Sequence, residues 1–316
     1  MTSRERWEKA LRFEEPDRPP HFEQMFELVE EAFGLSFPSE DELGAATGKE
    51  REKLYARTAE VYARTIEEFK WDAVTVWRPA ARSRVQYDFI PFLKKYLGPD
   101  ILVGAFIWDS AVSIDAVDSY GYMQFSIDLF ENPGKLHAWA RGMLDVGLDH
   151  AARLIDAGCD ILDIASDYAF NSGTFISPAQ FREFTTPYMS ELVSFIKDNG
   201  VTVIFHSDGN LMGVLDQILE IGPDVLQSID PMAGMDIAEV KRLTYGRMAL
   251  MGNVQCSLLQ DGPAEKIRES ADYCLDHGAP GGGFIYSTSN TIFKGIPLEN
   301  YRHMVEHMWQ RYGGAI

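Results

Sequence analysis

The sequence contains only three cysteines among its 316 residues, Cys159, Cys256 and Cys274. The number is odd, no two of them form a CxxC pair, and each lies in an apolar or helical context. These features exclude a disulfide scaffold and argue against a thiolate metal cluster. We expect all three to be reduced thiols in or near the core.

Basic residues are also scarce, with 29 Lys and Arg against 48 Asp and Glu, a formal net charge of −19 and a pI near 4.7. Nucleic acids and anionic membranes both require a basic face, so neither is an expected partner. No apolar run approaches the length of a membrane span, and the first residues lack the apolar core of a secretion signal. We therefore expect a cytoplasmic protein.

The common phosphate-binding loops are missing as well. No GxGxxG follows the first predicted strand, and no GxxxxGK[ST] occurs in the chain. Gly281-Gly282-Gly283 leads into a predicted strand instead of a helix, which is typical of a tight turn. A dinucleotide-binding or P-loop protein is therefore not expected.

What the chain does have is a regular alternation of short β-prone runs and longer helical segments. The predicted strands are 20–25, 72–77, 101–107, 160–165, 201–206, 224–229, 247–252 and 282–287. The predicted helices are 3–13, 49–69, 133–157, 178–199, 211–221, 236–244, 263–277 and 298–311. Eight such units favour an α/β fold, a (β/α)8 TIM barrel with an N-terminal helical extension, over an open doubly wound sheet. We expect residues 1–316 to form one domain.

In such a barrel, chemistry is located where strands end. The run Val201-Thr202-Val203-Ile204-Phe205 leads into His206-Ser207-Asp208, and residues two apart on a strand face the same way. The candidate catalytic residues at strand ends are His206, Asp167, Glu23 and Asp109. Of these Glu23 interrupts an apolar run, where a carboxylate needs a partner or a cation.

His206, Asp208 and Asp167 are the candidate metal ligands. Imidazole and carboxylate donors without a thiol suit zinc or a similar divalent ion. Two alternatives remain at this stage: the carboxylates act as general acid and base without a metal, or Asp208-Gly209-Asn210 is ordinary turn and capping chemistry.

Further polar and aromatic residues follow the predicted strands and would line a pocket for a flat or ring-shaped ligand. The candidate substrate-binding residues are Trp77, Arg78, Trp108, Tyr168, Asn253, Ser289 and Asn290.

Several segments, in this order, resemble the uroporphyrinogen decarboxylase superfamily. They are Ser3-Arg4-Glu5-Arg6, Pro16-Asp17-Arg18-Pro19-Pro20, Asp72-Ala73-Val74, Ala157-Gly158-Cys159-Asp160, Phe205-His206-Ser207-Asp208-Gly209, Met251-Gly252-Asn253-Val254 and Pro297-Leu298-Glu299-Asn300. Each is short, but the ordered set spans nearly the whole chain. The resemblance implies a (β/α)8 barrel and an enzyme that is either a decarboxylase or a cobamide-dependent methyltransferase.

The departures from the family pattern distinguish between these activities. Decarboxylases carry an arginine-rich segment after strand 1, where this chain has Glu23-Gln24-Met25-Phe26-Glu27, and Trp77-Arg78-Pro79 replaces their aspartate after strand 2. The thiol-methylating branch uses His-x-Cys and a later Cys for zinc, where this chain has His206-x-Asp208 and no second cysteine. Oxygen donors would make a metal more electrophilic, which favours an ether as substrate.

The resemblance therefore implies transfer of a methyl group from a methoxylated, aromatic small molecule to a corrinoid, with zinc as the suspected cofactor. The corrinoid would be carried by a separate corrinoid-binding protein, because the chain has no DxHxxG cobalamin motif. A decarboxylase acting on a porphyrinogen or a smaller acid is the alternative, and a non-catalytic barrel that binds a tetrapyrrole is a third reading. A homodimer is left open.

Overall fold

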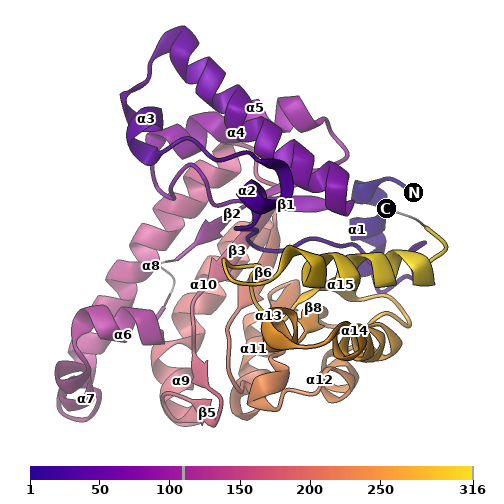
Figure 1. Ribbon diagram of the computed structural model, residues 1–316. Coiled ribbons are helices and arrows are strands. Elements are labelled where there is room, and N and C mark those ends of the chain that lie inside the picture. Colours follow the sequence, from indigo (N-terminus) through magenta and orange to yellow (C-terminus); the bar gives the residue numbers. More distant parts are fainter. Residues whose placement is uncertain (109–110, 315–316) are drawn as a thin grey trace.

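The computed structural model describes residues 1–108 and 111–314. Its centre is a seven-stranded sheet in which neighbouring strands are parallel, in the order β1-β2-β3-β6-β7-β8-β9. The strands are β1 (Ala73–Val76), β2 (Leu102–Ile107), β3 (Ile161–Ala165), β6 (Thr202–His206), β7 (Val225–Gln227), β8 (Ala249–Val254) and β9 (Phe284–Thr288). Helices surround these strands in Figure 1. This arrangement confirms the predicted TIM-type α/β barrel.

The predicted first strand, 20–25, is wrong as a strand: the chain makes only an isolated bridge there, between His21 and Tyr286. The segment still closes the barrel, because Tyr286 N donates to Pro20 O at 2.8 Å and Asp72 N donates to His21 O at 2.8 Å. It therefore lies between β9 and β1. Pro19 and Pro20 have no backbone N–H, so a continuous ladder cannot form through them.

The outer layer consists of helices connected by short loops. They are α1 (Ser3–Leu11), α2 (Val29–Phe33), α3 (Glu40–Ala45), α4 (Gly48–Phe69), α5 (Arg84–Leu97), α6 (Ile114–Tyr120), α7 (Tyr122–Glu131), α8 (Pro133–Asp156), α9 (Pro178–Phe184), α10 (Thr186–Asp198), α11 (Leu215–Ile221), α12 (Ile237–Thr244), α13 (Cys256–Asp261), α14 (Ala264–Gly278) and α15 (Leu298–Arg311). A small hairpin of β4 (Ala169–Phe170) and β5 (Gly173–Thr174) follows β3.

Several helices were not predicted from the sequence, among them α5 and α7, and one predicted helix is divided in two. Helix α5 was not predicted because it contains Pro91, and a proline in a sequence is typical of a helix end. Helix α7 was not predicted because its apolar residues do not form a single face; Met123 and Phe130 are exposed to solvent. The single helix predicted over 178–199 is divided at Thr185, just before Pro187, which cannot continue the hydrogen bonding of α9.

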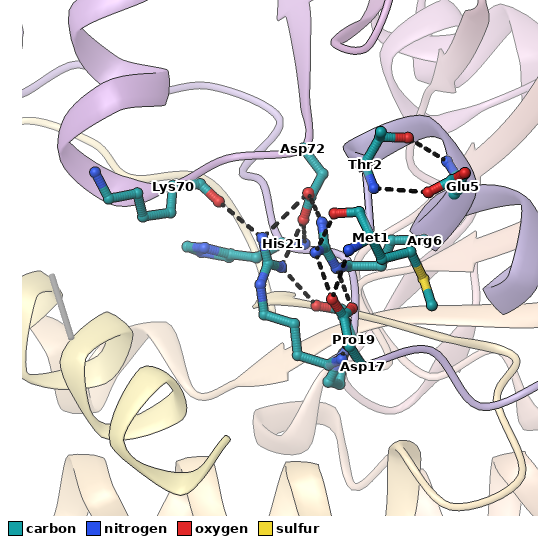
Figure 2. Close-up of polar contacts among 10 residues, drawn as sticks. Met1, Thr2, Glu5, Arg6, Asp17, Pro19, His21, Lys70 and Asp72 are labelled. Atoms are coloured by element: carbon teal, nitrogen blue, oxygen red, sulfur yellow. Dashed lines mark hydrogen bonds and ion pairs between the residues drawn. The ribbon is translucent and has the colours of Figure 1, made fainter. Parts of the chain in front are cut away.

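The end of the barrel at the N-termini of the strands is held by a buried ion network, shown in Figure 2. The carboxylate of Asp72, immediately before β1, accepts from Arg6 Nη1 at 2.6 Å and from Arg18 Nη1 at 2.6 Å. It also accepts the backbone N–H of His21 at 2.8 Å. One carboxylate therefore connects α1, the closing segment and β1.

No helix in the described part of the chain is both long enough and apolar enough to cross a membrane.

Candidate metal and active site

Two neighbouring strands, β3 and β6, bring three of the predicted site residues together at their carboxyl ends. Ala165 and His206 are register partners, and Asp167 and Asp208 each follow two residues later. One ligand atom from each of Asp167, His206 and Asp208 lies within 4.8 Å of the others. His206 Nε2 is 3.8 Å from Asp167 Oδ1, and both residues are accessible to solvent in part. The predicted ligands therefore form a single cluster.

Neighbouring polar groups hold the two carboxylates in place. The backbone N–H of Asp208 donates to Asp167 Oδ1 at 2.8 Å. Ser228 Oγ donates to Asp208 Oδ1 at 2.9 Å, and Asn290 Nδ2 donates to Asp208 Oδ2. Asp208 thus receives support from β7 and from the loop after β9, which fixes its orientation toward the cluster.

Glycine at position 209 is required for this arrangement. Gly209 has φ +83°, and a Cβ there would lie 2.3 Å from the carbonyl oxygen of Ala169. The hairpin β4-β5 therefore packs directly against the turn that follows Asp208. This close approach holds the site loop against the barrel.

The cluster has an excess of negative charge. Burial raises the pKa of Asp208, His206 lowers it, and the neighbouring Asp167 carboxylate raises it further. A carboxylate in such surroundings gains from a nearby cation. The donor set of one imidazole and two carboxylates fits zinc or a similar divalent ion, and three protein ligands leave a coordination position for a substrate.

Beneath this cluster, the barrel interior contains a second buried acid, Asp163 on β3. Its side chain is fully buried; Oδ2 accepts from Gln24 Nε2 at 2.7 Å, and Oδ1 has no partner among the described residues. Burial raises the pKa of Asp163 to about 7, although His206 and Gln24 oppose the shift. Asp163 is therefore a buried acid whose charge state changes near neutral pH.

Asp163→Asn should make the protein relatively more stable at high pH. An unfolded aspartate has a pKa of about 3.9, so between that pH and about 7 the folded state binds a proton that the unfolded state does not. The contribution of the Asp163 carboxyl to the free energy of unfolding of wild type is fully present below about pH 4 and decreases as the pH rises to about 7. The asparagine side chain of the variant does not titrate, so the variant does not show this decrease with pH. Its amide oxygen can still accept the hydrogen bond from Gln24.

The free energies of unfolding of both proteins, measured in urea with chelator at pH 5, 6.5 and 8, test this. The free energy of unfolding of the variant minus that of wild type should increase with pH, by up to about 1.4 kcal/mol per pH unit below pH 7. If the difference between the two free energies of unfolding does not depend on pH, the raised pKa of Asp163 is contradicted.

Glu23, predicted to be catalytic, is not among the three clustered residues. It is fully buried, and its carboxylate accepts from Ser287 Oγ at 2.6 Å and from the backbone N–H of Thr288 at 3.0 Å. His21 Nε2 lies 3.8 Å from Glu23 Oε1. The hydroxyl and amide donors satisfy the carboxylate, so Glu23 anchors the closing segment to β9. The other predicted catalytic residue, Asp109, lies outside the described residues.

Two predicted substrate-binding residues, Trp77 and Arg78, line a pocket of about 530 Å³ next to the end of β1. Arg78 Nη1 donates to Glu40 Oε1 at 3.0 Å, and the guanidinium lies over the Trp77 ring at 5.3 Å. None of the described residues that line this pocket belongs to the metal cluster. Trp77 and Arg78 are thus associated with a separate hollow, on the β1 side of the barrel.

Trp108 and Tyr168 have different surroundings. Trp108 is 42% exposed and packs on Phe106 with a ring distance of 4.9 Å. Tyr168 is fully buried and stacks on Phe205 at 5.4 Å. Tyr168 was predicted to line a substrate pocket; its ring instead packs between Phe205 of β6 and Phe181 of α9 and is fully buried. Trp108 keeps an accessible ring.

The remaining predicted substrate residues mostly hold loops. Asn253 Nδ2 donates to Ile229 O at 2.8 Å, and Ser289 Oγ accepts the backbone N–H of Cys256 at 3.3 Å. Both side chains are nearly fully buried. Asn290 differs, because its amide contacts Asp208 and so supports the candidate metal-binding cluster.

The cysteines take no part in the cluster. All three are free and buried. Burial raises the pKa of Cys256 and of Cys274 to about 12, and it raises that of Cys159 as well. They are therefore protonated thiols at neutral pH, as expected for core cysteines.

The sequence places Gln227 near the end of a predicted strand, but Gln227, Ser228, Asp163 and Gln24 are not among the candidate site residues. Gln227 ends β7 and Ser228 follows it directly; the strand register places them beside His206 and Asp208. For Asp163 a signal was present, since the residue interrupts the apolar run Ile161-Leu162-Asp163-Ile164.

A family model described as "Uroporphyrinogen decarboxylase (URO-D)" matches residues 56–310. Among curated proteins, the uroporphyrinogen decarboxylase of Thermus thermophilus is 29% identical over 151 residues, which is 48% of this chain and 41% of that protein. The one from Aromatoleum aromaticum is 24% identical over 252 residues, 76% of this chain and 68% of that protein. The match to the Thermus relative thus spans less than half of that protein's length.

Among solved structures, a methyltransferase from Methanosarcina mazei matches with a TM-score of 0.76 at 19% identity, covering 99% of each chain. At this identity the likeness concerns the fold.

Proposed function

The chain belongs to the uroporphyrinogen decarboxylase family, and we propose that within it this protein transfers a methyl group from a methoxylated aromatic compound to the reduced corrinoid of a separate protein. The observation that carries the proposal is the cluster of Asp167, His206 and Asp208, which offers nitrogen and oxygen donors and no thiolate. Such a donor set suits activation of an ether oxygen better than activation of a thiol.

The three residues would hold a divalent metal, with zinc as our first choice. A bound zinc ion supplies Lewis acidity, which stabilises negative charge on the oxygen that leaves. The chain supplies the rest: Ser228 and Asn290 fix the Asp208 carboxylate, and the backbone of Asp208 fixes Asp167. The exposed ring of Trp108 is available to pack against an aromatic substrate.

In the proposed reaction the bond between the methyl carbon and the ether oxygen breaks. The methyl group passes to the reduced corrinoid, and the phenolate keeps the bonding electrons and takes up a proton. An aryl ether is a poor methyl donor because phenolate leaves slowly, so charge on the oxygen must be stabilised in the transition state. In this proposal the acceptor protein approaches the barrel mouth, where Asp167 is accessible to solvent in part.

A decarboxylase is the second candidate, because the curated relatives bear that name and because burial raises the pKa of Asp163 to about 7, where an acid can donate and accept a proton near neutral pH. Porphyrinogens, however, carry many carboxylates. The segment Glu23-Gln24 contributes an acid and an amide that contact Ser287 and Asp163, and no cationic clamp. This makes a smaller acid the better decarboxylase substrate.

We expect the zinc-loaded protein to convert methoxylated phenols to the free phenols, with methylation of cob(I)alamin or of its cognate reduced corrinoid protein. Loss of the cobalt(I) absorbance under anaerobic conditions, together with phenol quantification, measures this. The control is zinc-loaded His206→Ala.

Failure of a broad methoxyarene panel with the reduced cognate corrinoid protein would contradict the proposal. Release of carbon dioxide from a carboxylic substrate would favour the decarboxylase.

A further inference from the structure

Gln227, the last residue of β7, contacts His206 from the neighbouring strand. The two are register partners in parallel strands, so their side chains emerge on the same face of the sheet. Gln227 is fully buried, and its Oε1 is hydrogen-bonded to His206 Nδ1. Its own Nε2 has no partner among the described residues. Gln227 therefore has one side-chain contact of consequence, and that contact is His206.

This contact determines which ring nitrogen of His206 has a free lone pair. A carbonyl oxygen accepts, so Nδ1 must carry the proton that Gln227 Oε1 receives. Nε2 of the neutral ring then presents a lone pair toward Asp167 Oδ1, 3.8 Å away. Three acceptors, namely Nε2 and two carboxylates, then converge on one point. A cation suits such a point.

The opposite orientation of the Gln227 amide would give a different site. The Gln227 Nε2 would then donate to His206 Nδ1, so the proton of the neutral ring would lie on His206 Nε2. The ring would direct this proton toward Asp167 and would have no lone pair for a metal. The barrel interior distinguishes the two orientations. Asp163 emerges on the same face, from the strand on the other side of β6, and its Oδ1 lacks a donor. When the Asp163 carboxylate is ionised, an amide N–H₂ directed into this interior is favourable, whereas an amide oxygen is repelled.

We infer that Gln227 is a positioning residue that fixes the Nδ1–H tautomer of His206 and thereby makes Nε2 a metal ligand. This inference rests on the metal site proposed above. Partners of this kind on the second nitrogen of a ligating histidine change metal affinity by roughly 10- to 100-fold when they are removed.

Two variants test the inference through zinc affinity, measured by chelator competition at fixed pH. Gln227→Met keeps the side-chain length and removes the acceptor, and should weaken zinc binding about 10- to 100-fold. Gln227→Glu keeps an acceptor oxygen opposite Nδ1, and should bind zinc at least as tightly as wild type. The matched control is Gln217→Met, a buried glutamine that contacts Thr186 and Pro178 instead.

Wild-type affinity in Gln227→Met would overturn the inference. Absence of zinc binding in wild type would overturn the metal site itself, which is a distinguishable result.

The tautomer can also be observed without substitution. Selective ¹⁵N labelling of the seven histidines, with assignment by His206→Ala, reports the protonation of each ring nitrogen. We expect a protonated Nδ1 and an unprotonated Nε2 in metal-free protein at a pH where the ring is neutral. A neutral His206 protonated at Nε2 would overturn the inference even if Gln227→Met does not fold.

Discussion

His206→Ala is expected to abolish binding of the divalent metal and to reduce methyl transfer by at least about 100-fold. His206 supplies the only nitrogen in the described cluster, and Asp167 and Asp208 alone are two mutually repelling carboxylates. The alanine leaves no ligand on β6 and removes the partner of Gln227. Metal content after zinc loading, determined by elemental analysis per chain, measures the first effect. The cobalt(I) assay measures the second.

The control for this variant is His303→Ala, which alters a histidine on α15 that contacts only the exposed Glu299 among the described ion pairs. It should keep wild-type metal content and activity. Equal metal content in wild type and His206→Ala would remove His206 from the ligand set.

Asp72→Asn should produce the largest loss of stability, about 3–5 kcal/mol in the free energy of unfolding. The Asp72 side chain is fully buried between Arg6 and Arg18, whose side chains are only 8% and 6% exposed. The amide has nearly the same shape but no charge, so a buried guanidinium loses its counter-ion. Arg6 retains its ion pair with Asp17, whereas among the described residues the Arg18 guanidinium retains hydrogen bonds to carbonyl oxygens, the Trp309 ring and no direct carboxylate partner.

Urea denaturation of Asp72→Asn beside Asp149→Asn tests the network. Asp149 pairs with Arg153 one helical turn away on an exposed face of α8, and such a pair contributes roughly 0.3–0.5 kcal/mol. The barrel account predicts a clear difference between the two variants. Similar small losses in both would mean that the closing segment is held by its backbone hydrogen bonds alone.

The sequence predicted the barrel well because its strands are buried on both faces. Runs such as Leu102–Ile107 are continuously apolar, which is typical of parallel strands. The first strand was the exception. Pro19 and Pro20 leave too few donors for a ladder, and closure there depends on single hydrogen bonds and on Asp72, which no local pattern indicates.

Within the site, local spacing identified His206 with Asp208, and position after a strand identified Asp167. The contacts that support these ligands could not be predicted in this way, although Asn290 was among the candidate substrate-binding residues. Gln227 contacts His206 only because β6 and β7 pair in one particular register, and Asn290 reaches Asp208 across 82 positions of sequence. Glu23 and Asp163 show the same limit: both interrupt apolar runs, yet one binds β9 hydroxyls and the other the Gln24 amide.

The central claim is that Asp167, His206 and Asp208 hold one divalent metal ion at the mouth of the barrel. A crystal structure of the zinc-loaded protein, with diffraction data collected on both sides of the zinc absorption edge, tests it most directly. The account predicts a single anomalous peak about 2.0–2.2 Å from His206 Nε2 and from an oxygen of each carboxylate. No peak between these three residues, or a hydrogen bond from Nε2 to Asp167 in its place, would contradict it.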